Sequence, residues 1–130
     1  MAVEVHLVTP ERELWSGEAD MVIARGVEGE VGILAGHAPM LIRLAIAPLR
    51  IRVNERDVVA VADGGFLHVT TDEGTTRVDV LATGAELATE IDPASAESRL
   101  EEAQRRLAER DDEEGRAELA RALVRVHVAA

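Results

Sequence analysis

Residues 3 to 88 repeat a hydrophobic period of two, and this pattern restricts the fold more than any other feature of the sequence. In the first segment Val3, Val5 and Leu7 alternate with Glu4 and His6, as in a strand that buries one face. Similar apolar segments cover residues 40–46, 49–53, 58–62, 66–70, 76–81 and 85–88, separated by turn residues at 54–56, 63–65, 72–74 and 83–84. Such closely spaced short strands predict an antiparallel β-sandwich or barrel.

The hydrophobic period changes at Asp92-Pro93, where a helix is expected to begin. Asp92 has the chemistry of an N-cap, and Pro93 suits the first helical position. Apolar residues then recur three or four residues apart as far as Arg110, which is helical spacing. The acidic run 111–114 suits the start of a second helix, because the helix dipole favours negative charge there. An apolar stripe follows along residues 117–126.

These two patterns divide the chain into a β-sandwich domain, residues 1–90, and a two-helix antiparallel hairpin, residues 91–130. The apolar stripes of the hairpin are narrow and rich in alanine. Two such helices bury little surface against each other, so the hairpin is expected to dock on its own sandwich or on a partner.

Composition excludes several classes of partner. The chain of 130 residues carries 14 basic and 25 acidic side chains, a net charge of -11, which opposes binding to nucleic acid or anionic lipid. It has no cysteine, and therefore no disulfide or thiolate chemistry. No apolar stretch approaches 18 residues, so no direct membrane insertion is expected.

Catalytic motifs are not evident. The 4 histidines lie far apart, without the close spacing of a zinc site. The serines, at positions 16, 95 and 98, do not lie in a nucleophile elbow. The sequence therefore predicts a protein without catalytic residues or a metal site.

A glycine-rich run, residues 26–39, contains acidic side chains that a structural turn does not require. Its glycines and Pro39 indicate a shaped corner between strands. A phosphate-binding loop is disfavoured, because Glu28 and Glu30 would repel the anion and because a strand, not a helix, is expected to follow. The acidic tip therefore points to a contact surface.

Several runs resemble the epsilon subunit of bacterial F-type ATP synthases. They are Ser16-Gly17, EGEVGIL at 28–34, GHAPML at 36–41 and DGGFL at 63–67, and the resemblance spans essentially the whole chain. It implies a sandwich of about ten strands followed by two helices. It also implies a non-catalytic subunit of the central stalk, peripheral to the cytoplasmic face of the bacterial plasma membrane.

The same resemblance implies contact residues. Glu30 matches an acidic turn that faces the polar loops of the c-subunit ring. Thr9, His37 and Ile42 match positions that contact the gamma subunit, although a hydrogen bond that closes the turn would also explain His37. In the family the hairpin docks on the sandwich or extends along gamma into the alpha/beta head, where it restrains ATP hydrolysis. Four arginines are candidates for contact with acidic segments of the beta subunits, although solvated arginines on a helix surface would look the same: Arg105, Arg106, Arg121 and Arg125.

One departure from the family concerns nucleotide binding. Some epsilon subunits bind ATP through an Ile-Asp-x-x-Arg-Ala motif at the start of the first helix. The corresponding run here is Ile91-Asp92-Pro93-Ala94-Ser95-Ala96, with Ser95 in place of the arginine. Loss of that charge removes the expected phosphate contact, so no cofactor is expected.

A second function remains open at this point. The chain would also suit a free-standing β-sandwich binding module whose hairpin recruits a helical partner. Only the hypothesis of an ATP synthase subunit predicts a stable complex with a gamma subunit.

Overall fold

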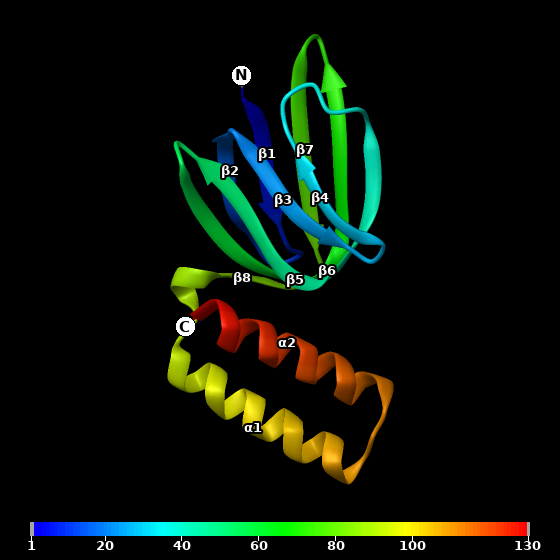
Figure 1. Ribbon diagram of the computed structural model, residues 1–130, viewed down its shortest axis with the longest axis vertical. Coiled ribbons are helices and arrows are strands. Elements are labelled where there is room, and N and C mark those ends of the chain that lie inside the picture. The colour runs from blue at the N-terminus through cyan, green and yellow to red at the C-terminus, as the bar shows by residue number, and fades with distance from the viewer. Residues whose placement is uncertain (1, 130) are drawn as a thin grey trace.

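The computed structural model describes residues 2–129, which form eight strands and two helices (Figure 1). The strands are β1 (Val3–Val8), β2 (Glu13–Ala19), β3 (Met21–Gly26), β4 (Gly29–Ile33), β5 (Met40–Val53), β6 (Arg56–Asp72), β7 (Thr75–Ala82) and β8 (Ala85–Leu87). A short 3-10 turn, η1 (Ala88–Glu90), leads to α1 (Pro93–Glu109) and α2 (Glu113–Ala129). The fold class predicted from the sequence, a β-sandwich followed by a helical hairpin, is confirmed.

The strands pair in the order β2-β1-β7-β6-β5-β3-β4, with β8 added to β6. Every pair is antiparallel except β1 with β7, which run parallel with Val3 opposite Thr76 and Val8 opposite Leu81. This exception was not predicted, because the alternation of apolar residues shows that a segment is a strand but not which distant strand it pairs with.

Two long strands explain why there are eight strands instead of about ten. The sequence prediction of a turn at 63–65 is wrong, since β6 continues through Gly64 and Gly65, whose φ angles are +82° and +115°. Before this kink β6 pairs with β8, and after it with β7. Likewise β5 runs continuously over two of the predicted strands. A glycine pair inside a strand and a glycine turn look the same in a sequence.

The core of the sandwich is aliphatic, as the alternating pattern requires. Val3, Val5 and Leu7 are fully buried, as are inward-facing residues of the other strands: Val22, Ile33, Leu49, Ile51, Leu67, Val69, Val78 and Val80. Trp15 is half-buried at the margin of this core.

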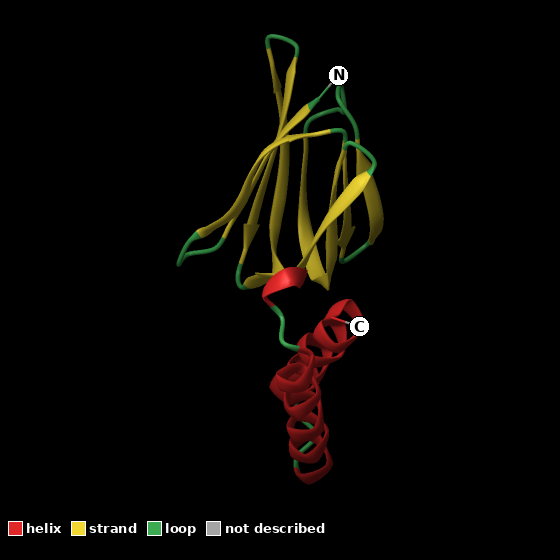
Figure 2. Ribbon diagram, turned by 90° about the vertical axis from the view of Figure 1, so that its left-hand side faces the viewer, coloured by secondary structure: helices red, strands yellow, loops and turns green. Residues whose placement is uncertain are grey.

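The helical hairpin lies against one end of the sandwich, with α2 the nearer helix (Figures 1 and 2). α1 begins as predicted: Asp92 is its N-cap and accepts hydrogen bonds from the backbone N of Ser95 at 3.2 Å and its hydroxyl at 2.7 Å. Small buried residues, Ala96, Ala103 and Ala122, lie along the two helices. Neither helix in the described part of the chain is long and apolar enough to span a membrane.

Candidate functional site

The junction between hairpin and sandwich has little apolar contact. α2 contacts β5 and β6. Ala47 of β5 and Val61 of β6 are buried but lie outside the core of the sandwich, and both belong to the strands that α2 contacts. Because alanine and valine side chains are small, apolar burial at this junction contributes modestly.

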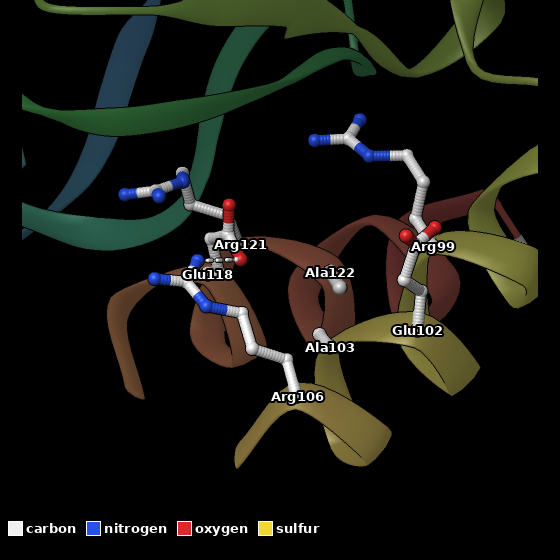
Figure 3. A pocket seen from close by; sticks show the side chains of 7 residues that line it. All are labelled: Arg99, Glu102, Ala103, Arg106, Glu118, Arg121 and Ala122. Atoms are coloured by element: carbon white, nitrogen blue, oxygen red, sulfur yellow. Dashed lines mark hydrogen bonds and ion pairs between the residues drawn. The ribbon is translucent and has the colours of Figure 1, made fainter. Parts of the chain in front are cut away.

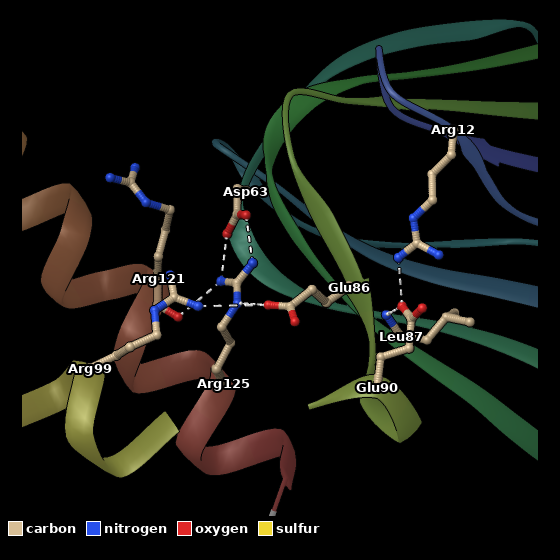
Figure 4. A network of polar contacts seen from close by, with 8 residues as sticks. All are labelled: Arg12, Asp63, Glu86, Leu87, Glu90, Arg99, Arg121 and Arg125. Carbon is tan, nitrogen blue, oxygen red and sulfur yellow. Dashed lines mark hydrogen bonds and ion pairs between the residues drawn. The ribbon is translucent and has the colours of Figure 1, made fainter. Parts of the chain in front are cut away.

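An arginine of α2 is buried at this junction. The side chain of Arg125 is 4% exposed. Its Nη1 and Nη2 donate to the two carboxylate oxygens of Asp63 at 2.8 and 2.6 Å, and its Nε donates to Glu86 at 2.5 Å (Figure 4). Nη1 also donates to the carbonyl of Arg121 at 3.1 Å. We call Arg125, Asp63 and Glu86 the Arg125 cluster.

Arg125 keeps its positive charge in this cluster. Burial by itself lowers the pKa of Arg125, but the hydrogen bonds to Asp63 and Glu86 outweigh that effect and leave the pKa above its ordinary value. Two carboxylates around one guanidinium satisfy most of its donors, so the cost of removing the charge from water is largely offset.

A second ion pair fixes the linker between the two parts. Arg12, in the turn after β1, donates to Glu90 of η1 at 2.8 Å, and the same carboxylate accepts from the backbone N of Leu87 at 2.9 Å (Figure 4). The hydrogen bond from Arg12, followed by that from Leu87, lowers the pKa of Glu90.

The four arginines assigned to the beta subunits have different surroundings. Arg105 is exposed. Arg106 pairs with Glu118 across the hairpin at 2.6 Å, and Arg121 lies half-buried in the same interhelical groove (Figure 3). Arg125 is occupied by the Arg125 cluster, so its predicted role in contacting another subunit requires the hairpin to leave the sandwich.

The three residues assigned to gamma do not converge on one spot. Thr9 follows the end of β1, and its hydroxyl accepts from the backbone N of Arg12 at 3.3 Å. His37 lies at the opposite end of the sheet, since the adjacent amide of Gly36 donates to the hydroxyl of Thr76, which is level with the start of β1. Ile42 packs partly against the core. These assignments remain predictions.

His37 also makes the turn hydrogen bond considered from the sequence. Its Nδ1 donates to the carbonyl of Ala38 at 2.8 Å, and its backbone N donates to the carbonyl of Leu34 at 3.1 Å. The side chain thus has a structural role in the corner, whatever else it contacts.

An exposed apolar patch lies beside Thr9 and was not predicted from the sequence. Phe66 and Leu81 are 46% and 50% exposed and lie opposite each other on β6 and β7. Together with Val8, Thr9 and Pro10 they line a shallow depression on the outer face of the sheet. We call these five residues the Phe66 patch. The sequence does contain a sign of this patch. Phe66-Leu67 and Val80-Leu81 are pairs of adjacent apolar residues, and two neighbours in a strand point to opposite faces of the sheet, so one of each pair must face away from the core.

Glu30 is exposed at the tip of a hairpin. It lies in β4 opposite Arg25 of β3, and the neighbouring Val27 is also exposed. The same tip borders a depression that α2 lines with Leu123 and Val124. The acidic turn is therefore at the end of the sandwich that carries the hairpin.

Two features bear on a metal or nucleotide site: clusters of metal-ligating side chains, and the arginines near the hairpin. Nowhere between residues 2 and 129 do three histidine or carboxylate side chains gather as a metal site would require. The interhelical groove has Arg99, Arg106 and Arg121, but Glu102 and Glu118 line it too. At the start of α1 the hydroxyl of Ser95 is bonded to Asp92, so a phosphate there would meet a carboxylate.

Comparison with known proteins gives a consistent family. The family model for the ATP synthase, Delta/Epsilon chain, beta-sandwich domain matches residues 2–88. The ATP synthase epsilon chain of Thermobifida fusca is 48% identical, covering 96% of this chain and 90% of that one. The ATP synthase epsilon chain of Brevibacillus brevis is 44% identical, covering 85% and 80%.

A solved structure shares the fold across both parts of the chain. It is a chain of the mitochondrial ATP synthase of Euglena gracilis, described as OSCP, F1 and c-ring in one rotational state. The TM-score is 0.79 at 27% identity, covering 95% of this chain and 78% of that one.

Proposed function

Because the chain belongs to the ATP synthase epsilon chain family, and is thus a non-catalytic subunit, we propose that it joins the gamma subunit to the c ring in the central stalk. The observation that carries this proposal is the pair of exposed features at separate places on one rigid sandwich. The Phe66 patch offers apolar surface and Glu30 offers a charged tip. A subunit that links two partners needs two such surfaces.

The Phe66 patch is the part of the sandwich best suited to gamma. Exposed apolar residues grouped on one sheet face mark contact sites for other proteins. Thr9, which the family resemblance already assigns to gamma, lies in this patch. We extend the gamma contact to Phe66 and Leu81. His37, at the other end of the sheet, and Ile42 are proposed as further gamma contacts outside the patch.

Glu30 is the proposed contact with the c ring. An exposed carboxylate at the tip of a stiff two-stranded turn can meet basic side chains on a rotating ring without rearrangement, and such charge pairing mainly sets register. Arg25 lies opposite Glu30 on β3.

The helical hairpin is proposed to limit ATP hydrolysis by leaving the sandwich and entering the alpha/beta head. The modest apolar contact at the junction supports this, because a docked state with little buried surface can exchange with an extended one. Arg105, Arg106, Arg121 and Arg125 are the proposed contacts with beta.

The test is ATP hydrolysis by the reconstituted complex with the full chain, with a chain ending at Glu90, and with no epsilon. The shortened chain keeps every strand and η1, so it should still bind. Slower hydrolysis with the full chain than with the shortened one supports the proposal. Equal rates would refute the inhibitory role, and loss of binding by both chains would refute the stalk assignment.

We also propose that the chain works without bound nucleotide, as a peripheral subunit at the cytoplasmic face of the membrane. The Asp92-Ser95 hydrogen bond and the two glutamates of the interhelical groove support the absence of a nucleotide site. Calorimetric titration with MgATP tests this: a dissociation constant below about 100 μM, or roughly -5.5 kcal/mol, would contradict it.

A further inference from the structure

We propose that Asp63 and Glu86 form an internal acceptor for Arg125, which holds the hairpin on the sandwich and hides that arginine from other carboxylate-bearing partners. This inference rests on the proposed inhibitory role of the hairpin and names the contact that would regulate its release. The sandwich then competes with the acidic partner for the same guanidinium.

The acceptor is assembled from two strands that are distant in sequence from α2. Asp63 lies in β6 and Glu86 in β8, and both carboxylates reach Arg125 at 2.8 Å or less. Asp63 is 13% exposed and grips both terminal nitrogens of the guanidinium. A bidentate pair of this kind tolerates little displacement of α2.

The backbone around Asp63 leaves room for its carboxylate. The backbone N of Asp63 donates to the carbonyl of Gly84 at 2.9 Å. A Cβ atom at Gly84 would lie 3.0 Å from Oδ2 of Asp63, so a larger residue there would crowd the carboxylate. On the other side Gly64 and Gly65 carry β6 through its kink with positive φ angles. The Asp63-Gly64-Gly65 run was predicted from the sequence to be a turn. In the structure it is a kink in β6 that places the Asp63 carboxylate against α2.

The rest of the junction does not replace this contact. The apolar residues buried there outside the sandwich core are small, and the other helix adds Arg99 at 3.8 Å from Glu86. A buried ion cluster contributes less to the free energy of unfolding than to the selection of one geometry, because breaking it leaves a buried charge without a partner. The docked position of the hairpin therefore depends on the Arg125 cluster.

Release of the hairpin changes what α2 displays. Arg125 and Arg121 are one helical turn apart on the same side of α2, and Arg121 is already half-exposed. Once Arg125 leaves Asp63 and Glu86, the two guanidiniums form a fork for a peptide segment that carries at least two carboxylates. The partner is recognised only in the released state.

The first test uses the isolated full-length chain and hydrogen exchange of the backbone amides of α2. Asp63→Asn and Glu86→Gln remove the charge of the acceptor while keeping side-chain size. Asp57→Asn is the matched control, because Asp57 also lies in β6 and also pairs with an arginine, Arg52 at 3.0 Å.

We expect the combined Asp63→Asn and Glu86→Gln chain to exchange its α2 amides at least tenfold faster than the wild type, with the amides of β1 and β7 unchanged. Arg125→Lys, which keeps the charge but loses the fork, should give an intermediate rate. Equal α2 rates in the acceptor variants and in Asp57→Asn would overturn the proposal.

The second test uses ATP hydrolysis by the complex. The acceptor variants should lower hydrolysis several-fold below the wild type, and adding Arg125→Gln should restore it towards the rate of the chain ending at Glu90. If the shortened chain raises hydrolysis but the acceptor variants behave as wild type, the masking of Arg125 is refuted. If shortening has no effect, the inhibitory role itself fails, and hydrogen exchange still decides whether the cluster holds the hairpin.

Discussion

Replacing Phe66 by serine should weaken binding to gamma without unfolding the sandwich. A phenylalanine side chain exposes roughly 200 Å² when free, and 46% of Phe66 is exposed, so about 90 Å² is available for a partner to cover. At about 25 cal/mol per Å² this area contributes about 2 kcal/mol to binding. The dissociation constant should therefore rise about 30-fold.

The assay is titration of the wild-type and Phe66→Ser chains into a complex that contains gamma and lacks epsilon, with thermal denaturation of each chain alone. Leu123→Ser is the matched control, because Leu123 is 48% exposed but lies on α2, outside the Phe66 patch. A dissociation constant for Phe66→Ser within about twofold of the control would refute the assignment of gamma to this face. A large fall in the melting temperature of the isolated Phe66→Ser chain would refute the view that Phe66 faces outward and does not stabilise the core.

Three other predictions concern the tip, the kink and the linker. Glu30→Lys should lower ATP-driven proton pumping several-fold with ATP hydrolysis kept, whereas Glu28→Lys in the same turn should have little effect; equal losses would contradict a specific c-ring contact. Gly65→Ala should destabilise the chain by about 2–4 kcal/mol in chemical denaturation, because its Cβ would clash with the carbonyl of Leu81. Gly64→Ala, where the nearest atom is 3.7 Å away, should cost about 1 kcal/mol, and a reversed order would contradict the geometry of the kink. The lowered pKa of Glu90, caused first by Arg12, means that its ion pair stabilises the chain above the ordinary glutamate pKa and is lost as the pH falls through the folded-state value. The difference in melting temperature between wild type and Glu90→Gln should therefore shrink on going from pH 6 to below pH 4, and a constant difference would count against this pair.

The strands and helices were largely predictable because their signals are local. Val3, Val5 and Leu7 alternate with polar residues, and Asp92-Pro93 caps a helix by its own chemistry. The kink at Gly64-Gly65 was not predictable, because positive φ angles suit a turn as well as an interrupted strand.

The candidate sites were less predictable because they depend on contacts between distant segments. An arginine on an amphipathic helix is usually solvated, and only the arrival of Asp63 and Glu86 from two strands buries Arg125. The Phe66 patch was detectable in principle from adjacent apolar residues, but the parallel alignment of β1 with β7 that completes it was not.

That parallel pairing also fixes when the chain can fold during its synthesis. β1 is made before the other strands and can pair early with β2. Its second partner, β7, ends at Ala82, so the other edge of β1 must wait for most of the sandwich to be made. Contacts of such long sequence separation slow folding. One edge of β1 therefore stays unpaired until β7 has emerged, and a nascent chain that stops short of β7 is open to aggregation through that edge or to capture by a chaperone.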